Sequence, residues 1–229
     1  MDQAEFDQYA DAYDQQHAAN IAITGESPDY FAEYKARETA RIARLHDISP
    51  SKIVDFGAGI GNTLPHLKSE FPDSRIYAAD VSEKSLAISA ARFPEIATNI
   101  LINRSIPLED ASADLVFTAC VFHHIDPGEH GFWLSEIRRV LRPGGLFVLF
   151  EHNPLNPLTL HAVNTCPFDE NAILIRNSEM RKRFRVANWN APSSRFHVFF
   201  PSILKVMRPT ERLLEWLPLG GQYSISAVR

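Results

Sequence analysis

The residues best suited to chemistry form a glycine-rich turn that directly follows a short apolar run. The turn consists of Gly57, Ala58, Gly59, Ile60 and Gly61. Glycine permits positive φ angles and lets a ligand approach the backbone with no Cβ in the way. Asp55 lies two residues before the first glycine, where it would repel a pyrophosphate and attract an ammonium or a sulfonium group. The turn therefore favours a ligand with positive charge over a dinucleotide, whose G-x-G-x-x-G fingerprint also places its third glycine one residue later.

A second carboxylate is spaced to bind a ribose. Asp80 ends the apolar run that begins at Arg75, and it lies 19 residues beyond Gly61. A carboxylate in this place can accept hydrogen bonds from both ribose hydroxyls, as the acidic residue of NAD-binding folds does. Asp80 therefore indicates a ribosyl cofactor without choosing between a nicotinamide and another nucleoside.

Two pairs of polar residues follow apolar runs further along the chain. His123 and His124 come after the run 114–119, and Glu151 and His152 come after the run 146–150. Imidazole and carboxylate groups at such positions are candidates for general acid–base catalysis, so these four residues are the candidate catalytic residues. The alternative is that they are packing residues whose polar atoms bind the backbone.

A metal site at the histidines is not expected from the sequence. The spacing of Cys120, His123, His124 and His130 matches no common zinc-binding pattern.

The elements that position these residues can be read from the hydrophobic pattern. Apolar residues at steps of three and four predict helices over 6–21 and 28–48, the second capped by Ser27 with Pro28 at its first turn. From residue 52 strands alternate with helices, which predicts right-handed crossovers and a parallel sheet covered on both faces. The expected strands are 52–56, 75–80, 99–103, 114–119 and 146–150, and the expected helices are 62–71, 83–93 and 129–141.

The last third of the chain has a weaker pattern. Residues 152–177 contain several prolines and asparagines and are expected to form a long, partly helical excursion. Beyond it we expect a helix from Ser178 to Ala187, a strand over 196–200, a broken helix over 202–216 and an antiparallel strand over 222–228.

Four passages together resemble the class I S-adenosylmethionine-dependent methyltransferases. They are the glycine-rich turn, the strand ending at Asp80, the passage 106–117 (IPLEDASADLVF) and the passage 139–145 (RVLRPGG), in the family's order and spacing. The segment 6–14 is similar to the family's lead-in that covers the cofactor. The resemblance implies an α/β fold with a doubly wound, seven-stranded, mostly parallel sheet in the order 3-2-1-4-5-7-6, and S-adenosyl-L-methionine as the cofactor.

The resemblance also implies a set of cofactor-binding residues. They are Tyr13, Lys35, Asp55, Gly57, Ala58, Gly59, Gly61, Asp80, Val81, Asn103, Ser105 and Cys120. The passage 103–105 lacks the acidic residue that the family usually places near the adenine, so Asn103, Ser105 or a backbone N–H would serve there.

Composition narrows the class of protein. The 229 residues, with 45% hydrophobic and 22% charged side chains, suit one α/β domain, with a helical cap over 1–48 and a methyltransferase-type domain over 49–229 that carries 152–177 as an insertion on the acceptor side. A net charge of −5 argues against a nucleic-acid partner. The polar N-terminus and the absence of a long apolar run argue against a signal peptide and against stable membrane insertion, so we expect a cytoplasmic protein.

The sequence therefore predicts methyl transfer to an oxygen or nitrogen of a small metabolite, such as a sugar- or lipid-linked intermediate. Two alternatives remain: an NAD(P)-dependent oxidoreductase, and a cofactor-binding module without catalytic activity. The basic cluster Arg176, Arg181, Lys182, Arg183 and Arg185 is either a phosphate-binding site or a solvated helix face. The sequence leaves the oligomeric state open.

Overall fold

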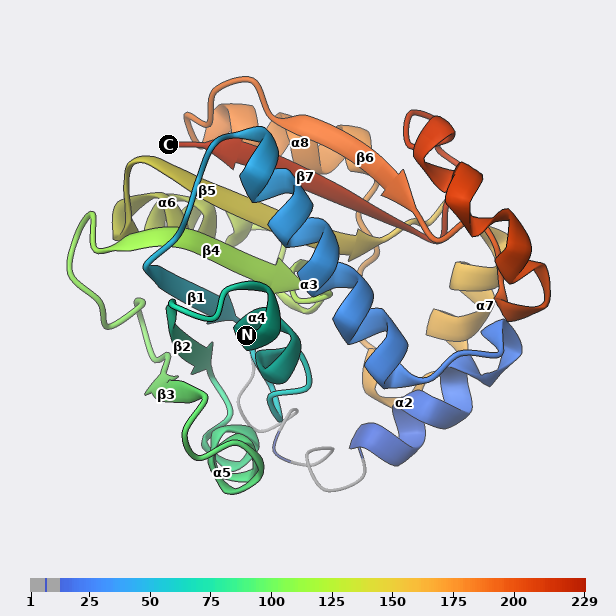
Figure 1. Ribbon diagram of the computed structural model, residues 1–229, viewed down its shortest axis with the longest axis horizontal. Helices are drawn as coiled ribbons and strands as arrows, with labels where there is room; N and C mark the ends of the chain where they lie inside the picture. The colour runs from blue at the N-terminus through green and yellow to red at the C-terminus, as the bar shows by residue number, and fades with distance from the viewer. Residues whose placement is uncertain (1–6, 8–12) are drawn as a thin grey trace.

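The computed structural model describes Asp7 and residues 13–229, and its centre is one seven-stranded sheet (Figure 1). The strand order is β3-β2-β1-β4-β5-β7-β6, and only β7 runs antiparallel to its two neighbours. This order and the reversed last strand confirm the predicted fold class. The strands are β1 (Lys52–Phe56), β2 (Arg75–Asp80), β3 (Ala97–Leu101), β4 (Ala113–Ala119), β5 (Leu141–His152), β6 (Ser193–His197) and β7 (Gln222–Val228).

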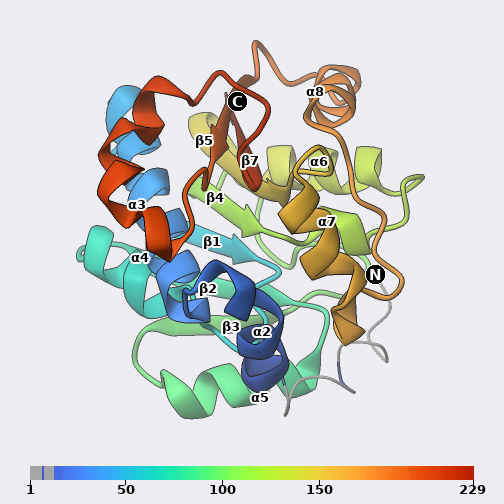
Figure 2. The ribbon, with the colours of Figure 1, turned by 90° about the vertical axis from the view of Figure 1, so that its right-hand side faces the viewer.

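Helices cover both faces of the sheet (Figures 1 and 2). One face carries α3 (Pro28–Leu45), α4 (Leu64–Glu70) and α5 (Glu83–Arg92), whose apolar residues share a core with the sheet. The other face carries α6 (His130–Val140) and α8 (Asn177–Val186), which close a second core. The remaining described helical segments are α2 (Tyr13–Ile21), η1 (Ala22–Thr24), η2 (Phe122–His124), α7 (Pro157–Asn164), η3 (Pro167–Asp169) and η4 (Ser202–Leu213).

The long helix α3 begins and packs as its sequence predicts. The Ser27 hydroxyl accepts a hydrogen bond of 3.2 Å from the Tyr30 amide, and Pro28 occupies the first helical position. Ala36, Ala40 and Ala43 face the sheet and are 1% exposed or less. Small residues on this face let the helix axis approach the strands closely, so α3 holds its remaining side chains at a fixed height above the sheet.

Several expected boundaries were wrong, and four of them are instructive. The edge strand β3 pairs with β2 from Ala97 to Leu101, two residues earlier than expected, because an edge strand has a weak apolar pattern. The strand β6 ends at His197 because Val198 has a φ of 63° and its carbonyl closes the hairpin with Gly221. The strand β5 begins at Leu141, opposite Ala113, and passes through an irregular register before Leu146.

The fourth correction concerns α8. Its N-cap residue is Arg176 and not Ser178, which lies inside the first turn. Arg176 has extended backbone angles and its carbonyl accepts the first helical hydrogen bonds, so a helix start here does not require a side-chain cap.

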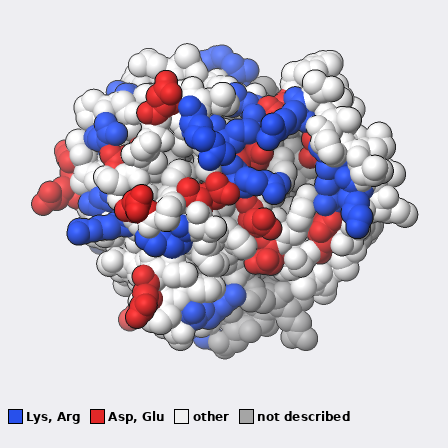
Figure 3. Space-filling model, in the orientation of Figure 1, with Lys and Arg blue, Asp and Glu red and all other residues white. Residues whose placement is uncertain are grey.

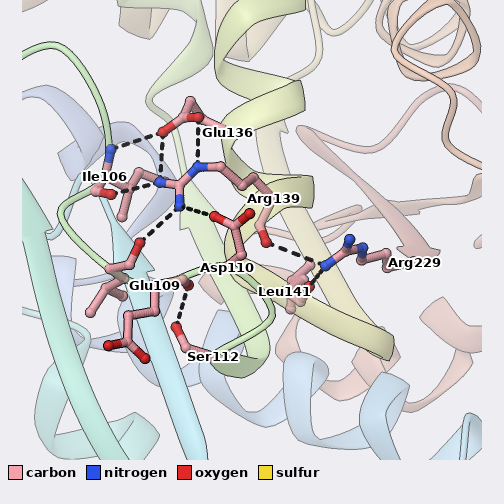
Figure 4. A network of polar contacts seen from close by, with 9 residues as sticks. Ile106, Glu109, Asp110, Ser112, Glu136, Arg139, Leu141 and Arg229 are labelled. Atoms are coloured by element: carbon pink, nitrogen blue, oxygen red, sulfur yellow. Dashed lines mark hydrogen bonds and ion pairs between the residues drawn. The ribbon is translucent and has the colours of Figure 1, made fainter.

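The passages 106–117 and 139–145 meet far from the glycine-rich turn, in a polar network around Arg139 (Figure 4). The guanidinium donates to the carbonyls of Ile106 and Leu108, both at 2.8 Å, and to the carboxylates of Asp110 and Glu136, at 2.7–2.9 Å. All five N–H groups of an arginine are used in this way. These two passages of the family resemblance therefore hold the loop before β4 against helix α6.

Charged side chains are mixed on the face that carries α3. Figure 3 shows Lys and Arg interleaved with Asp and Glu there, without a continuous basic surface. Within the part of the chain that the structure describes, no helix is both long enough and apolar enough to cross a bilayer.

Candidate functional site

A cavity of about 260 Å³ lies beyond the carboxyl ends of β1, β2, β4 and β5. Ligands of doubly wound sheets bind at this edge, where the strand order reverses. The roof consists of α2, the N-terminal half of α3, α7 and η4, which lie beyond the right-hand ends of β4 and β5 in Figure 1. The cavity therefore has the strand ends as its floor and helices from both ends of the chain as its lid.

The three glycines of the turn have different roles. Gly57, Gly59 and Gly61 have φ angles of 79°, 53° and 83°. A Cβ on Gly57 would lie 2.3 Å from a methyl group of Val121, and one on Gly61 would lie 2.6 Å from the hydroxyl of Ser89. A Cβ on Gly59 would meet no atom within 4 Å. The outer glycines therefore let the turn pack against the protein, and Gly59 leaves the backbone open to a ligand in the cavity.

Asp80 ties the end of β2 to the glycine-rich turn. One carboxylate oxygen accepts a hydrogen bond of 2.8 Å from the Gly59 amide, and the other accepts one of 2.9 Å from the Ser82 amide. Burial raises the pKa of Asp80, although these backbone hydrogen bonds oppose the shift. Each carboxylate oxygen has a second lone pair, and Asp80 lines the cavity, so it can also accept from a ribose.

Asp55 supplies a buried acceptor beneath the turn. Its Oδ2 atom has no hydrogen-bond partner among the residues that the structure describes. Burial and the negative charge of Asp80 raise the pKa of Asp55 to about 8, and Lys35 opposes the shift. A cationic ligand group nearby would favour the ionised carboxylate. The open turn, the ribose acceptor and this unpartnered carboxylate together fit S-adenosyl-L-methionine, which carries an ammonium and a sulfonium.

Cys120 lies at the end of β4, between Lys35 and His152. The Lys35 ammonium donates to the Cys120 sulfur at 3.6 Å, and Cys120 has a φ of 58°. Burial raises the pKa of the Cys120 thiol, but the positive charge of His152, that of Lys35 and a hydrogen bond from His152 outweigh it and lower the pKa to about 7. The three residues line the cavity, where they form a polar wall of mixed charge.

A buried network joins the two predicted pairs of catalytic residues. Glu151 accepts hydrogen bonds from the amides of Val121 and Phe122, at 3.1 and 2.7 Å, and its second oxygen lies 2.6 Å from Nδ1 of His123. The side chains of His123 and Glu151 are each 1% exposed. The Glu151 carboxylate therefore fixes the orientation of the His123 ring, and Nε2 of that ring points away from Glu151.

A third element completes this network. Asp169, at the end of η3, places its Oδ1 atom 3.5 Å from Nε2 of His123 and 3.3 Å from Nε2 of His124. The Ile173 amide donates to the His123 carbonyl at 2.8 Å, which holds the segment after η3 against η2. The segment 152–177 therefore adds the carboxylate of Asp169 to the residues at the ends of β4 and β5.

The charges of the network shift the pKa values of its members. Burial lowers the pKa of His123, but the negative charge of Glu151 and a hydrogen bond to Asp169 outweigh it and raise the pKa well above its usual value. Burial and the charge of His123 lower the pKa of His124. Burial raises the pKa of Asp169, but hydrogen bonds to both histidines dominate and lower it.

The structure brings most of the predicted site residues to one place. Those that line the cavity are Lys35, Gly57, Ala58, Gly59, Asp80, Val81, Cys120, His123, His124 and His152. Asp55, Gly61 and Glu151 lie outside this lining, and Asp55 and Glu151 are 2% and 1% exposed. The side chain of Tyr13 is outside the described residues.

Two predicted residues and the basic cluster lie elsewhere. Asn103 and Ser105 are exposed and do not line the cavity, because the chain turns away from the sheet edge after β3. The basic side chains of 176–185 do not line the cavity either. Arg183 is hydrogen-bonded to His130 and paired with Glu179, so the geometry favours a structural role for this member of the cluster.

The sequence analysis missed Asp169. It lies 45 residues beyond His124, in a segment without a regular pattern, and only the fold brings the two together. The one available signal was a carboxylate inside the proline-rich excursion, next to the buried Cys166.

Comparisons with known proteins identify a methyltransferase domain in the chain. Residues 54–149 match the family model of a methyltransferase domain. The malonyl-acyl-carrier-protein O-methyltransferase of Hahella chejuensis is 34% identical over 101 residues, which are 43% of this chain and 36% of that protein. The chain thus spans about a third of the length of this curated relative.

Solved structures show the same fold over more of the chain. A SAM-dependent methyltransferase of Thermotoga maritima, described as a possible histamine N-methyltransferase, has a TM-score of 0.69 at 16% identity and covers 99% of this chain and 98% of its own. Phosphoethanolamine N-methyltransferase 2 of Haemonchus contortus, in complex with S-adenosyl-L-methionine, has a TM-score of 0.57 at 16% identity and covers 79% and 49%. Residues 54–149 therefore match the methyltransferase domain, and the chain has the fold of SAM-dependent methyltransferases.

Proposed function

We propose that this chain transfers the methyl group of S-adenosyl-L-methionine to an oxygen or nitrogen atom of a small metabolite. One observation carries the proposal: a single cavity joins the glycine-rich turn and Asp80 to His124 and His152. A cofactor bound by the turn would have its sulfonium methyl directed into a space lined by groups that can take a proton. The helical lid over this space suits a small acceptor, or the small end of a larger one.

The chemistry asks little of the protein beyond positioning. S-adenosyl-L-methionine supplies an activated methyl group and its own leaving group, so the protein has to align the acceptor in line with the methyl–sulfur bond and exclude water. The lid helices would exclude water, and Asp55, Gly59 and Asp80 would hold the cofactor.

A hydroxyl or ammonium acceptor must also lose a proton, whereas a carboxylate need not. Among the four candidate catalytic residues, His123, His124 and His152 line the cavity, and His123 is held by its hydrogen bond to the buried Glu151. We assign the proton acceptor to the pair His124 and His152, and the orientation of the network to His123 and Glu151.

Apolar side chains beside the cavity favour an acceptor with an apolar portion. Leu158 of α7 lines the cavity and is 48% exposed, whereas Ile203 and Val206, 86% and 83% exposed, lie outside the lining on η4, the element whose Arg208 lines it. Exposed apolar groups that gather beside a site are typical of contact with an apolar ligand. We therefore place lipid-linked metabolites ahead of free sugars as acceptors.

The first test separates the cofactor classes. Calorimetric titration should give binding of S-adenosylmethionine and of S-adenosylhomocysteine, and no binding of NAD or NADP. Binding of NAD in competition with S-adenosylhomocysteine would contradict the proposal and favour an oxidoreductase.

The second test concerns transfer. The protein is incubated with S-adenosylmethionine that carries a trideuterated methyl group and with panels of lipid-linked, sugar, amine and carboxylate metabolites, and products are found by their mass. His124→Gln and His152→Gln should each lower turnover of a hydroxyl acceptor, whereas His161→Gln, an exposed histidine on α7, should leave it unchanged. Tight binding of S-adenosylhomocysteine without transfer to any class would favour a non-catalytic module.

A further inference from the structure

We propose that His123, His124 and Asp169 form a binding site for one divalent transition-metal ion of the Zn²⁺ type, on the acceptor side of the cavity. Each of the three offers one ligand atom, and these atoms all lie within 4.8 Å of one another. Such a site was not expected from the sequence, because the third ligand comes from the segment 152–177.

The distances from Asp169 to the two imidazole nitrogens match a tetrahedral site. Zn²⁺ binds imidazole nitrogen and carboxylate oxygen at about 2.0–2.2 Å, so two ligands of a tetrahedral ion lie about 3.4 Å apart. The Oδ1 atom of Asp169 lies 3.5 Å from Nε2 of His123 and 3.3 Å from Nε2 of His124. An ion can therefore enter between these atoms without a large movement of the backbone.

His123 makes the hydrogen bond through its second ring nitrogen that is typical of a metal-binding histidine. Metal-ligating imidazoles almost always use their second nitrogen to donate to a carboxylate or a carbonyl, which orients the ring and raises its basicity. Nδ1 of His123 lies 2.6 Å from Glu151, and Glu151 is itself fixed by the amides of Val121 and Phe122. Glu151 and His123 thus form a carboxylate–histidine pair, and Nε2 of His123 faces His124 and Asp169.

Burial adds a reason for a cation in this place. Glu151 and Asp169 are 1% and 7% exposed, so two carboxylates lie on opposite sides of the His123 ring with little access to water. Buried charges are stable only when they are paired or coordinate a metal. A divalent ion between the imidazoles and Asp169 balances both negative charges.

The proposed ion would have open coordination positions toward the acceptor. His123, His124 and Asp169 all line the cavity, so the face of the site opposite Glu151 opens into it. Three protein ligands with an open fourth position are typical of catalytic zinc sites, where the ion polarises a bound oxygen. The inference rests on the proposed function and deepens it: an oxygen-containing acceptor group would bind the ion, and His152 would then be the member of the pair left to take a proton.

The test uses the full chain after removal of metals with a chelator. It is titrated with Co²⁺, whose visible absorption reports a tetrahedral site, and with Zn²⁺ in calorimetry. We expect one equivalent to bind per chain. His124→Gln and Asp169→Asn should remove this equivalent, and Glu151→Gln should weaken binding about 10–100-fold. The matched control His161→Gln, on the exposed side of α7, should keep it.

Two further measurements distinguish a loss of metal binding from a loss of folding or of cofactor binding. Melting curves and titration with S-adenosylhomocysteine show whether each variant is folded and whether its cofactor site is intact, independently of the metal. Folded wild-type protein that binds S-adenosylhomocysteine but no Co²⁺ or Zn²⁺ would overturn the inference and leave an ion pair only, with the proposed function intact. Equal metal binding by wild type and Asp169→Asn would also overturn it, because the metal would then bind elsewhere.

Discussion

Asp80 gives the sharpest test of the cofactor site, because its carboxylate both holds the glycine-rich turn and lines the cavity, and the two effects can be measured separately. Its two oxygens accept hydrogen bonds of 2.8 and 2.9 Å from the amides of Gly59 and Ser82, and it lines the cavity. Asp80→Ala should therefore have two effects. It should lower the free energy of unfolding by about 2 kcal/mol, because buried amides lose a charged acceptor. It should also weaken cofactor binding by about 1–3 kcal/mol, because the charge-assisted hydrogen bonds to the ribose are lost.

The binding loss corresponds to a rise of about 5–150-fold in Kd for S-adenosylhomocysteine. Calorimetry well below the melting temperature of the variant measures it, and urea unfolding without ligand measures the stability. Asp80→Asn keeps a carbonyl acceptor and should show a smaller loss of both quantities. Asp73→Ala, at an exposed aspartate in the turn before β2, is the matched control. A folded Asp80→Ala protein with the Kd of the wild type would refute the ribose assignment.

Three other predictions test the network, a buried histidine and the cavity wall. Arg139→Lys keeps the charge but not the planar fork, so it should lower the free energy of urea unfolding by about 2–3 kcal/mol, close to the loss in Arg139→Ala; unfolding like the wild type would contradict this. Burial lowers the pKa of His197 from 6.5 to about 3. Between pH 3 and pH 6.5 the unfolded chain therefore binds one more proton than the folded chain, and the free energy of unfolding decreases as the pH falls below 6.5. His197→Gln should therefore make the decline in unfolding free energy shallower by about 1.4 kcal/mol per pH unit in this window, and parallel curves for variant and wild type would count against the assignment. Cys120, with its thiol pKa of about 7, should react with iodoacetamide faster than Cys166, which is 3% exposed, and S-adenosylhomocysteine should slow that reaction; mass spectrometry of the labelled peptides decides.

The alternation of strands and helices was predictable because each element buries its own local pattern. The runs 52–56, 75–80 and 222–228 were placed to the residue, since short apolar runs between turn-forming segments are read locally. The edge strand β3 and the hairpin strand β6 were misplaced by two or three residues. Their ends depend on register with a neighbour and on the positive φ of Val198, which no local pattern records.

The cofactor side of the site was predictable for the same local reason. The glycine-rich turn, Asp55 and Asp80 lie within one strand–helix–strand unit, where spacing along the chain fixes spacing in the fold. Asn103 and Ser105 were carried over by resemblance to a passage in which this chain departs from the family, and the structure leaves both exposed.

The sequence alone predicted the methyltransferase resemblance, the order of the strands and the cofactor, because these predictions rest on contiguous motifs and on the few ways in which a parallel sheet can be wound. Only the tertiary structure decided which residues surround the cavity beyond the glycine-rich turn. Asp169 meets His124 across 45 residues, and the lid joins α2, α7 and η4 from opposite ends of the chain. Such contacts depend on how the insertion packs over the strand ends, and packing between distant segments leaves no periodic trace in the sequence.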